Sequence, residues 1–266
     1  MALKWIDTHT HLQASDFDAD LLALIEQARA SGVVDMVICA GSRDDWQRCA
    51  DIAHSFDLSY MLGIHPLFTP QAQERDLATL TQRIEGAMAD PHFIGIGEIG
   101  LDGFVPTLDD ERQEYFFYEQ LRLAKTFDLP ISCHIRRSGS RLLKYFNRVG
   151  KVHGVLHAFN GSDDELKRFS ALGLKFGFGG ASTYAGSLRI RRHLAQLPAT
   201  AWVLETDAPD IPSSERRDSG NLRTEPIDIV QTAQVAATLR GRTLQEISDE
   251  TFRNALDVFP RLQIRH

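Results

Sequence analysis

Two histidines separated by one residue end the first apolar run of the chain. The stretch IDTHTH places His9 and His11 after Ile6, with Asp7 just before them. In an extended segment, alternate side chains point to the same face, so both imidazoles would face one way at a spacing that suits a shared ion. The pair therefore indicates a metal site at the end of a strand.

Further ionisable residues follow other apolar runs in the same manner. Imidazole and carboxylate are preferred ligands of zinc and manganese-like ions, and four histidines with two carboxylates can fill two adjacent sites. Two ions about 3.5–4 Å apart activate a water and clamp the oxygens of a hydrolysed ester. These ionisable residues predict metal-assisted hydrolysis, with one carboxylate able to bridge the ions. Besides His9 and His11, the set contains His65 in GIHP, Glu98 in GIGEIGLD, His134 in SCHIRR, His157 in LHAFNG and Asp207 in LETDAP.

Eight apolar runs supply the elements that would position these residues. The runs are continuous rather than alternating, as in a parallel sheet covered by helices. The fold class that this predicts is α/β, a single (β/α)8 TIM barrel over residues 1–266 with an extra C-terminal helix in residues 243–259. Barrel enzymes build their sites at the C-terminal ends of strands, where the ionisable residues fall. The runs are residues 3–9, 34–41, 58–66, 92–100, 129–135, 152–159, 174–180 and 201–209.

The segments between the runs have the signals of amphipathic helices. Apolar residues recur at helical spacing, for example at Leu21, Leu22 and Ile25, which predicts a buried face. Capping boxes are indicated where a serine or threonine precedes a glutamate by three residues. Residues 208–226, after the eighth run, are predicted to form a loop that walls or covers the site. The two capping boxes are Ser162 with Glu165 and Thr243 with Glu246.

Composition narrows the class of protein. The 266 residues are 43% hydrophobic and 24% charged, with no apolar run near the roughly 20 residues of a membrane span and no export signal. We therefore expect a cytoplasmic protein without membrane contact, and no obligate protein partner is evident. Cys39, Cys49 and Cys133 form no CxxC pair, which favours reduced, buried thiols. The net charge of −7 argues against a broad basic face for duplex nucleic acid, so metals or a few arginines would hold any phosphate.

The motifs DTHTH, GIHP, GEIGLD, HIRR, HAFNGS and LETDAP, in that order, resemble those of the TatD family. This is a family of metal-dependent deoxyribonucleases within the amidohydrolase superfamily, and the resemblance runs from about Ile6 to Phe259. It implies a barrel that cleaves phosphodiester bonds in DNA, often by removing nucleotides from a 3′ end. Two divalent metal ions are implied, with Mg²⁺, Mn²⁺ and Zn²⁺ all open.

The resemblance also implies a role for each member of the set. His9 and His11 would hold the first metal together with Asp207, and Glu98 would bridge both metals. Asp207 would also take the proton of the nucleophilic water, which suits a carboxylate that contacts both metal and water. The second metal would be held by His134 and His157.

Other residues are predicted to act around the metals. His65 falls on a position that the family uses beside the metals, and we expect it to bind the substrate phosphate rather than a metal, with a supporting or structural role as the alternative. Arg136, two residues after His134, is expected to hold a phosphate through its guanidinium, although a solvated loop cluster with Arg137 is the alternative. Two further carboxylates, Glu205 and Asp7, are expected to orient a ligating histidine or to serve structure rather than to bind metal.

Two departures from the family pattern concern loops. The family usually has an aromatic residue directly after GLD, where this chain has Gly103 followed by Phe104. Its usual RNEP reads RTEP here, with Thr224 in place of asparagine. Both departures lie outside the metal set, so they bear on loop geometry and substrate preference.

Two other functions remain open at this point. The same barrel and metals could hydrolyse a small ester, lactone, amide or phosphotriester, which suits the acidic composition slightly better. Alternatively, the metals could serve structure or partner binding in a protein that is not an enzyme. Structural zinc sites are usually closed by four ligands, often sulfur, whereas this set consists of nitrogen and oxygen.

Overall fold

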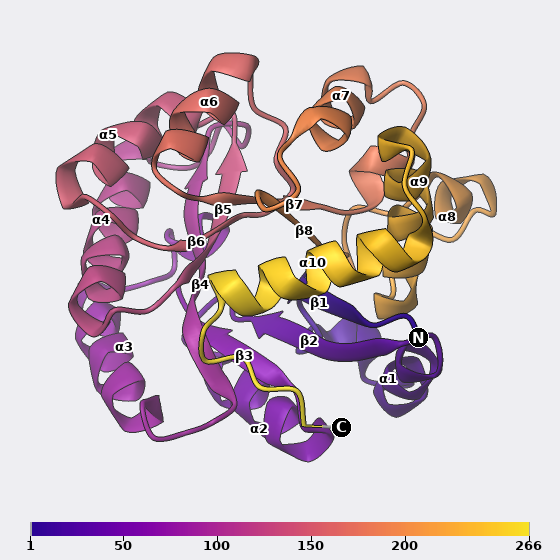
Figure 1. Cartoon of the computed structure of the whole chain (residues 1–266). Coiled ribbons are helices and arrows are strands. Elements are labelled where there is room, and N and C mark those ends of the chain that lie inside the picture. Colours follow the sequence, from indigo (N-terminus) through magenta and orange to yellow (C-terminus); the bar gives the residue numbers. More distant parts are fainter. Residues whose placement is uncertain (1, 266) are drawn as a thin grey trace.

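Eight parallel strands form one sheet in sequence order in a computed structural model that describes residues 2–265. Each strand pairs with the next one along the chain, which gives the (β/α)8 barrel predicted from the apolar runs (Figure 1). Their continuous burial explains why the runs lack alternation. The strands are β1 (Trp5–Thr10), β2 (Val33–Cys39), β3 (Ser59–Leu62), β4 (Phe93–Asp102), β5 (Ile131–Arg136), β6 (Gly154–Leu156), β7 (Lys175–Phe178) and β8 (Trp202–Leu204).

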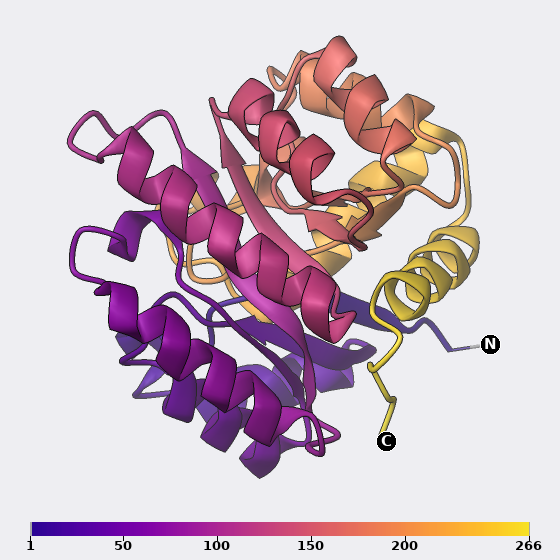
Figure 2. The same cartoon turned by 90° about the vertical axis from the view of Figure 1, so that its left-hand side faces the viewer.

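Helices surround the sheet and alternate with its strands (Figures 1 and 2). The α-helices are α1 (Leu21–Ala30), α2 (Trp46–Phe56), α3 (Glu74–Ala87), α4 (Asp110–Phe127), α5 (Gly139–Val149), α6 (Asp163–Ala171), α7 (Leu188–Gln196), α8 (Ser214–Asp218), α9 (Ile229–Arg240) and α10 (Leu244–Val258). Short 3-10 turns occupy connections after the strands: η1 (Ser15–Phe17), η2 (Pro66–Phe68), η3 (Gly180–Thr183) and η4 (Pro226–Asp228). The predicted capping boxes begin α6 and α10.

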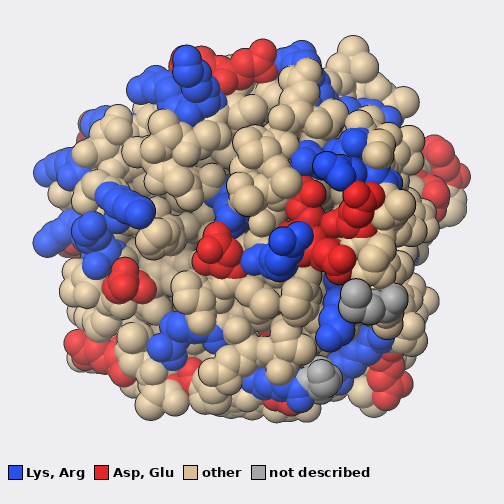
Figure 3. Space-filling view, in the orientation of Figure 1, with Lys and Arg blue, Asp and Glu red and all other residues tan. Residues whose placement is uncertain are grey.

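Helix α10 closes the end of the barrel at which the strands begin. Its Ala255 and Val258, followed by Phe259, pack with apolar side chains from inside the barrel, among them Ile6 and Val203. Figure 1 shows α10 lying across this end, and in Figure 2 it lies on the same side as both chain termini. On this face, basic and acidic side chains are intermixed (Figure 3). The opposite end, where the strands finish, is left for the site.

The seam between β8 and β1 is joined by hydrogen bonds around the strand ends. The hydroxyl of Thr8 donates to the carbonyl of Leu204 (2.8 Å). The Asp207 amide donates to the carbonyl of His9 (2.9 Å), and the His11 amide donates to that of Ala208 (2.7 Å). These bonds bring two segments almost 200 residues apart into register.

Two expectations about the connections are corrected. Leu22 is 57% exposed rather than part of the buried face of α1, because Leu24, Ile25 and Ala28 already provide that face. Residues 208–226 are not a plain loop, since they contain α8, which Ser213 caps through a hydrogen bond from Arg216 N.

The three cysteines are free and buried, as predicted. Within residues 2–265, none of the helices has the length and apolar character needed to cross a membrane.

Candidate metal centre

The residues predicted to bind metal meet at the end of the barrel where the strands finish. His9 lies in β1, Glu98 in β4 and His134 in β5. His157 follows β6, and Asp207 follows β8 with a φ of 60°. That left-handed conformation is uncommon for a residue with a side chain and is often found at functional sites. The barrel thus gathers candidate ligands from both halves of the chain.

Four atoms form a first group with nearly equal spacing. The Nε2 atoms of His9 and His11 lie 3.3 Å apart, and both lie 3.3 Å from Oε2 of Glu98. Asp207 Oδ1 lies 3.5 Å and 3.4 Å from the same two nitrogens. Two ligands about 2.1 Å from a shared ion in tetrahedral geometry lie about 3.4 Å apart. Each carboxylate oxygen therefore lies at the distance from the two imidazole nitrogens that a shared metal ion requires.

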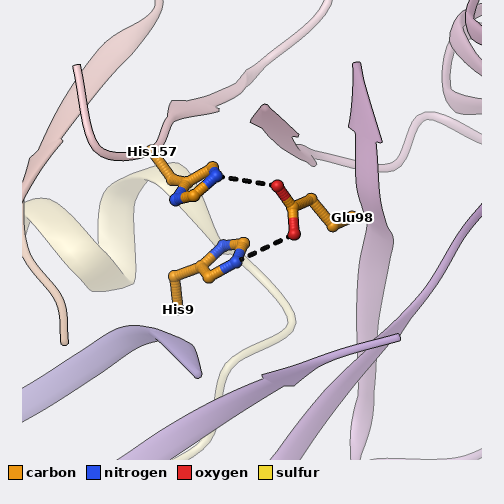
Figure 4. Close-up of side chains that lie close together, drawn as sticks. All are labelled: His9, Glu98 and His157. Carbon is orange, nitrogen blue, oxygen red and sulfur yellow. Dashed lines mark ion pairs between the residues drawn. The ribbon is translucent and has the colours of Figure 1, made fainter. Parts of the chain in front are cut away.

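A second group uses the other oxygen of the same glutamate. Glu98 Oε1 lies 2.7 Å from Nε2 of His157 and 3.1 Å from Nδ1 of His134, and these nitrogens are 3.4 Å apart. Figure 4 shows Glu98 directing one oxygen toward His157 and the other toward His9. The carboxylate therefore stands between two groups of nitrogen ligands, the position of a bridging ligand.

In His11 and His134, a hydrogen-bond acceptor on the far side of the ring holds the proton there. The other ring nitrogen then turns its lone pair toward the centre. His11 Nδ1 lies 2.8 Å from the carbonyl of Cys39, so this nitrogen carries the proton. His134 Nε2 lies 3.0 Å from Oδ2 of Asp102 and is protonated for the same reason. The lone pairs of both rings then face Glu98. Lone pairs crowded against a carboxylate require protons or a cation between them, which supports metal binding.

Sequence reasoning missed some of these supporting groups. It did not single out Ser132, whose hydroxyl lies 2.7 Å from His9 Nδ1. The alternation of strand faces in SCH could have indicated Ser132, two residues before His134. The Cys39 carbonyl has no signal in the sequence, because a backbone group carries none.

His65 differs from the ligand histidines in its proton position. Its Nδ1 accepts the backbone N–H of Leu67 (3.1 Å), because an amide can only donate. In a neutral ring the proton is then on Nε2, which lies 3.3 Å from Glu98 Oε1. His65 is therefore arranged as a hydrogen-bond donor at the edge of the centre rather than as a ligand.

The charges of the centre are strongly coupled. Burial would raise the pKa of Glu98, but the imidazoles of His65, His157 and His9 hold it well below its usual value. Burial lowers the pKa of His9 to about 4. Burial acts in the same direction on His157, but the Glu98 carboxylate outweighs it and raises that pKa to about 9. The ionised carboxylates thus hold protons on neighbouring rings, and a bound divalent ion would displace them.

Glu205 lies behind His157 but forms no hydrogen bond with its ring, so its role in orienting a ligand stays a prediction. Its Oε1 accepts the backbone N–H of Ala158 (2.5 Å) and lies 3.9 Å from His157 Nδ1. Burial raises the pKa of Glu205 to about 8. A Cβ at Gly177 would come within 1.9 Å of Glu205 Oε2, so glycine in β7 is what makes room for this carboxylate.

Asp7 forms hydrogen bonds at the seam between β1 and β8 rather than with the side chains of the candidate metal ligands. It accepts hydrogen bonds from the amide (3.0 Å) and the hydroxyl (2.5 Å) of Thr206, and also from the His9 amide (3.3 Å). Burial raises its pKa to about 7. The carboxylate therefore ties β1 to the segment after β8.

Arg136 and Arg223 differ in how closely carboxylates pair with them. Arg136 lies over the ring of Phe104, and its Nη1 is 4.0 Å from Asp102 Oδ2. Arg223, by contrast, is paired with Asp20 (2.7 Å) and Glu225 (3.0 Å). Arg136 thus lies beside the partner of His134, whereas Arg223 holds the wall of residues 208–226 against η1 and α1.

Comparison with known proteins agrees with the resemblance seen in the motifs. The family described as TatD related DNase matches residues 6–260. An uncharacterized metal-dependent hydrolase of Haemophilus influenzae is 35% identical, over 97% of this chain and 100% of its own length. The 3'-5' ssDNA/RNA exonuclease TatD of a Rahnella species is 34% identical, over 94% and 95%. The crystal structure of YJJV, a TatD homologue of Escherichia coli, superposes with a TM-score of 0.91 at 33% identity, over 98% and 99%.

The barrel and the imidazole–carboxylate groups at its strand ends define a metal-dependent hydrolase of the amidohydrolase type. Within that class, the chain belongs to the TatD family, because the family match spans nearly the whole sequence.

Proposed function

We propose that the protein is a two-metal phosphodiesterase that removes nucleotides from the 3′ end of single-stranded nucleic acid. Relatives of this chain are named deoxyribonuclease or 3'-5' ssDNA/RNA exonuclease. The observation that carries the proposal is the position of Glu98, whose two oxygens each face a separate group of nitrogen ligands. A pair of divalent ions, Mg²⁺, Mn²⁺ or Zn²⁺, supplies activation of a water and neutralisation of the scissile phosphate.

The residues of the chain then divide the work. His9, His11 and Asp207 would hold one ion, His134 and His157 would hold the other, and Glu98 would contact both. Asp207 would also accept the proton of the attacking water, a role that suits a carboxylate that contacts both metal and water. The Nε2–H of His65 and the guanidinium of Arg136 are placed to orient the phosphate.

Asp207→Asn tests the general base. The substitution should lower the hydrolysis rate by about 10³-fold while thermal unfolding of the metal-free protein stays nearly unchanged, because the amide keeps the shape of the carboxylate. The assay offers an end-labelled single-stranded oligonucleotide to the protein with each of the three ions, and the position of the label reports the direction of degradation. Full activity of the variant would show that another group accepts the proton.

A small ester or amide as substrate is the competing function. The same protein preparation is offered a panel of esters, lactones, amides and phosphotriesters in parallel with the oligonucleotide. We expect degradation of the oligonucleotide. Turnover of the panel while the oligonucleotide stays intact would refute the nuclease proposal and leave the metal centre in place.

A further inference from the structure

The large apolar side chains that are strongly exposed lie at one end of the molecule. Every one of those found among residues 2–265 lies in a connection that follows a strand or in the first two turns of the next helix. This is the end at which the candidate metal centre lies, and exposed apolar side chains beside a site are candidates for ligand contact. They are Leu22, Leu67, Phe68, Phe104, Tyr115, Leu188 and Leu222.

Phe68 stands directly beside the centre. It ends η2, three residues after His65, and its ring lies 6.2 Å from the His65 ring in an edge-on arrangement. A Cβ at Gly41 would come within 2.7 Å of the Phe68 ring, so the glycine after β2 lets the ring pack closely over that connection. The ring is still 43% exposed. An aromatic surface is thus fixed next to the residue that we expect to contact phosphate.

Phe104 forms a second aromatic surface on the neighbouring connection. The guanidinium of Arg136 lies 3.8 Å from its ring centre, and that of Arg137 lies 4.7 Å away. Asp102 Oδ1 accepts the Phe104 amide (2.7 Å), while its Oδ2 faces His134 (3.0 Å). Phe104 is therefore held through its backbone to the same carboxylate that contacts His134, and both arginines pack on its ring.

Gly103 explains the shift of the aromatic residue by one position. A Cβ at Gly103 would meet the carbonyl of Arg137 at 2.4 Å, and its amide donates to the Arg136 carbonyl (2.6 Å). A larger residue here would push the β5 connection away. The departure from the family pattern therefore brings both arginines close to Phe104.

The charge of this rim is available to a ligand. Arg137 contacts Phe104 and has no ion pair within residues 2–265, and Arg136 has only the 4.0 Å approach to Asp102. Arg216, on the opposite wall of the mouth, is instead paired with Glu225 (2.6 Å) and Asp228 (2.8 Å). In a chain with a net charge of −7, the free Arg137 and the weakly paired Arg136 put positive charge where an anionic backbone can reach it.

We propose that Phe68 and Phe104, with Arg136 and Arg137, form a subsite for the unpaired nucleotides next to the cleaved bond. The inference rests on the proposed nuclease function. The bases stack on the exposed Phe68 ring and on the planar Arg136–Phe104 pair, and the guanidinium groups bind the backbone phosphate. Stacking on aromatic and guanidinium planes is the usual way in which proteins hold single strands without reading sequence. A duplex keeps its bases stacked internally, so the subsite selects single-stranded ends.

Bases and rings can be removed separately to test the subsite. One labelled oligonucleotide is unmodified, and its matched partner has abasic residues on both sides of the cleaved bond, with the same phosphates. Phe68→Ala and Phe104→Ala should each lower kcat/KM on the unmodified strand by about 10-fold and leave it unchanged on the abasic strand. Phe104→Trp should retain activity on both strands. Tyr115→Ala, which removes an exposed aromatic ring on α4, is the matched control and should have no effect.

Other outcomes would overturn the inference. Equal losses on the two strands would mean that the rings only support the fold, and no loss on either would mean that they do not bind nucleotides. Sedimentation that changes from a dimer to a monomer in Phe104→Ala would identify the rim as a contact between copies of the chain. If the wild-type protein cleaves no oligonucleotide, the proposed function fails together with the subsite, whereas cleavage that the variants do not alter refutes the subsite alone.

Discussion

At the scale of single residues, the proton position of His65 separates a phosphate donor from a metal ligand. Because Nδ1 accepts the Leu67 amide, His65→Gln should leave the metal content unchanged and lower kcat/KM by about 10²-fold. His134→Gln is the matched comparison and should lose one equivalent of metal, since His134 presents Nδ1 to Glu98. Metal content is measured by mass spectrometry of the dialysed proteins. Loss of an ion from His65→Gln would place this residue among the ligands.

A second prediction concerns the space that β7 leaves for Glu205. Gly177→Ala puts a methyl group where Glu205 Oε2 lies, at 1.9 Å, and should lower the free energy of unfolding by about 1–3 kcal/mol. Adding Glu205→Ala removes the overlap, so the double variant should be less destabilised than the sum of the single ones. Urea unfolding of the four proteins measures this coupling. Additive losses would mean that the carboxylate moves aside freely.

At the scale of elements, a buried carboxylate joins the starts of β2 and β3. Asp35 accepts the amides of Met36 (2.7 Å) and Ser59 (3.0 Å) and the Ser59 hydroxyl (2.7 Å), yet burial raises its pKa to about 6. The folded state therefore binds more protons than the unfolded state between about pH 4 and pH 6, and stability from this group falls as pH rises through that window.

Asp35→Asn should remove this pH dependence. The amide oxygen keeps the two backbone donors, and its nitrogen can donate to the Ser59 hydroxyl. At pH 8 the variant should exceed the wild type in stability by on the order of 1–2 kcal/mol, and the difference should shrink toward pH 4. Denaturant unfolding at several pH values checks both points. A variant that is less stable at pH 8 would show that the ionised carboxylate is favourable here.

The elements were predictable because their signals are local. Continuous apolar runs gave all eight strands, and the capping boxes located the starts of α6 and α10. Leu22 was misassigned because helical spacing identifies a stripe without showing which edge of it a neighbour covers. Helix α8 was missed because it is only five residues long and polar. Such a helix is held by tertiary pairs like Arg216 with Asp228, which the order of residues does not reveal.

The side chains of the site could be predicted from the sequence, but the groups that hydrogen bond to them could not. The set of ionisable residues followed from the strand ends, since a barrel brings these ends together, whereas the assignment of His9, His11 and Asp207 to one metal came from the family resemblance. The Cys39 carbonyl behind His11 and the Leu67 amide at His65 are backbone groups. Their roles depend on three-dimensional distances, and these same contacts distinguish a ligand from a donor.

At the scale of the whole molecule, the proposed first metal would join the two ends of the barrel. Its ligands come from β1 and from the segment after β8, where the seam depends on a few hydrogen bonds such as that between Thr8 and Leu204. An ion at 100 times its Kd would stabilise the folded state by about 2.7 kcal/mol, which corresponds to a Tm change of roughly 5–10 °C in a protein of this size. Removal of metal with a chelator should therefore lower Tm by that amount.

The part of the protein that loses stability when the metal is removed shows whether the ion holds the seam together or stabilises the whole fold. Hydrogen exchange of the metal-free protein should accelerate most in β1 and in residues 202–208, because opening the seam exposes their amides first. His11→Ala should show this acceleration even with metal added, whereas His157→Ala should not, since His157 belongs to the second group. Acceleration spread evenly over all eight strands would mean that the metal does not act at the seam. Acceleration confined to the seam would mean that the ion that serves hydrolysis also holds the first and last strands of the barrel together.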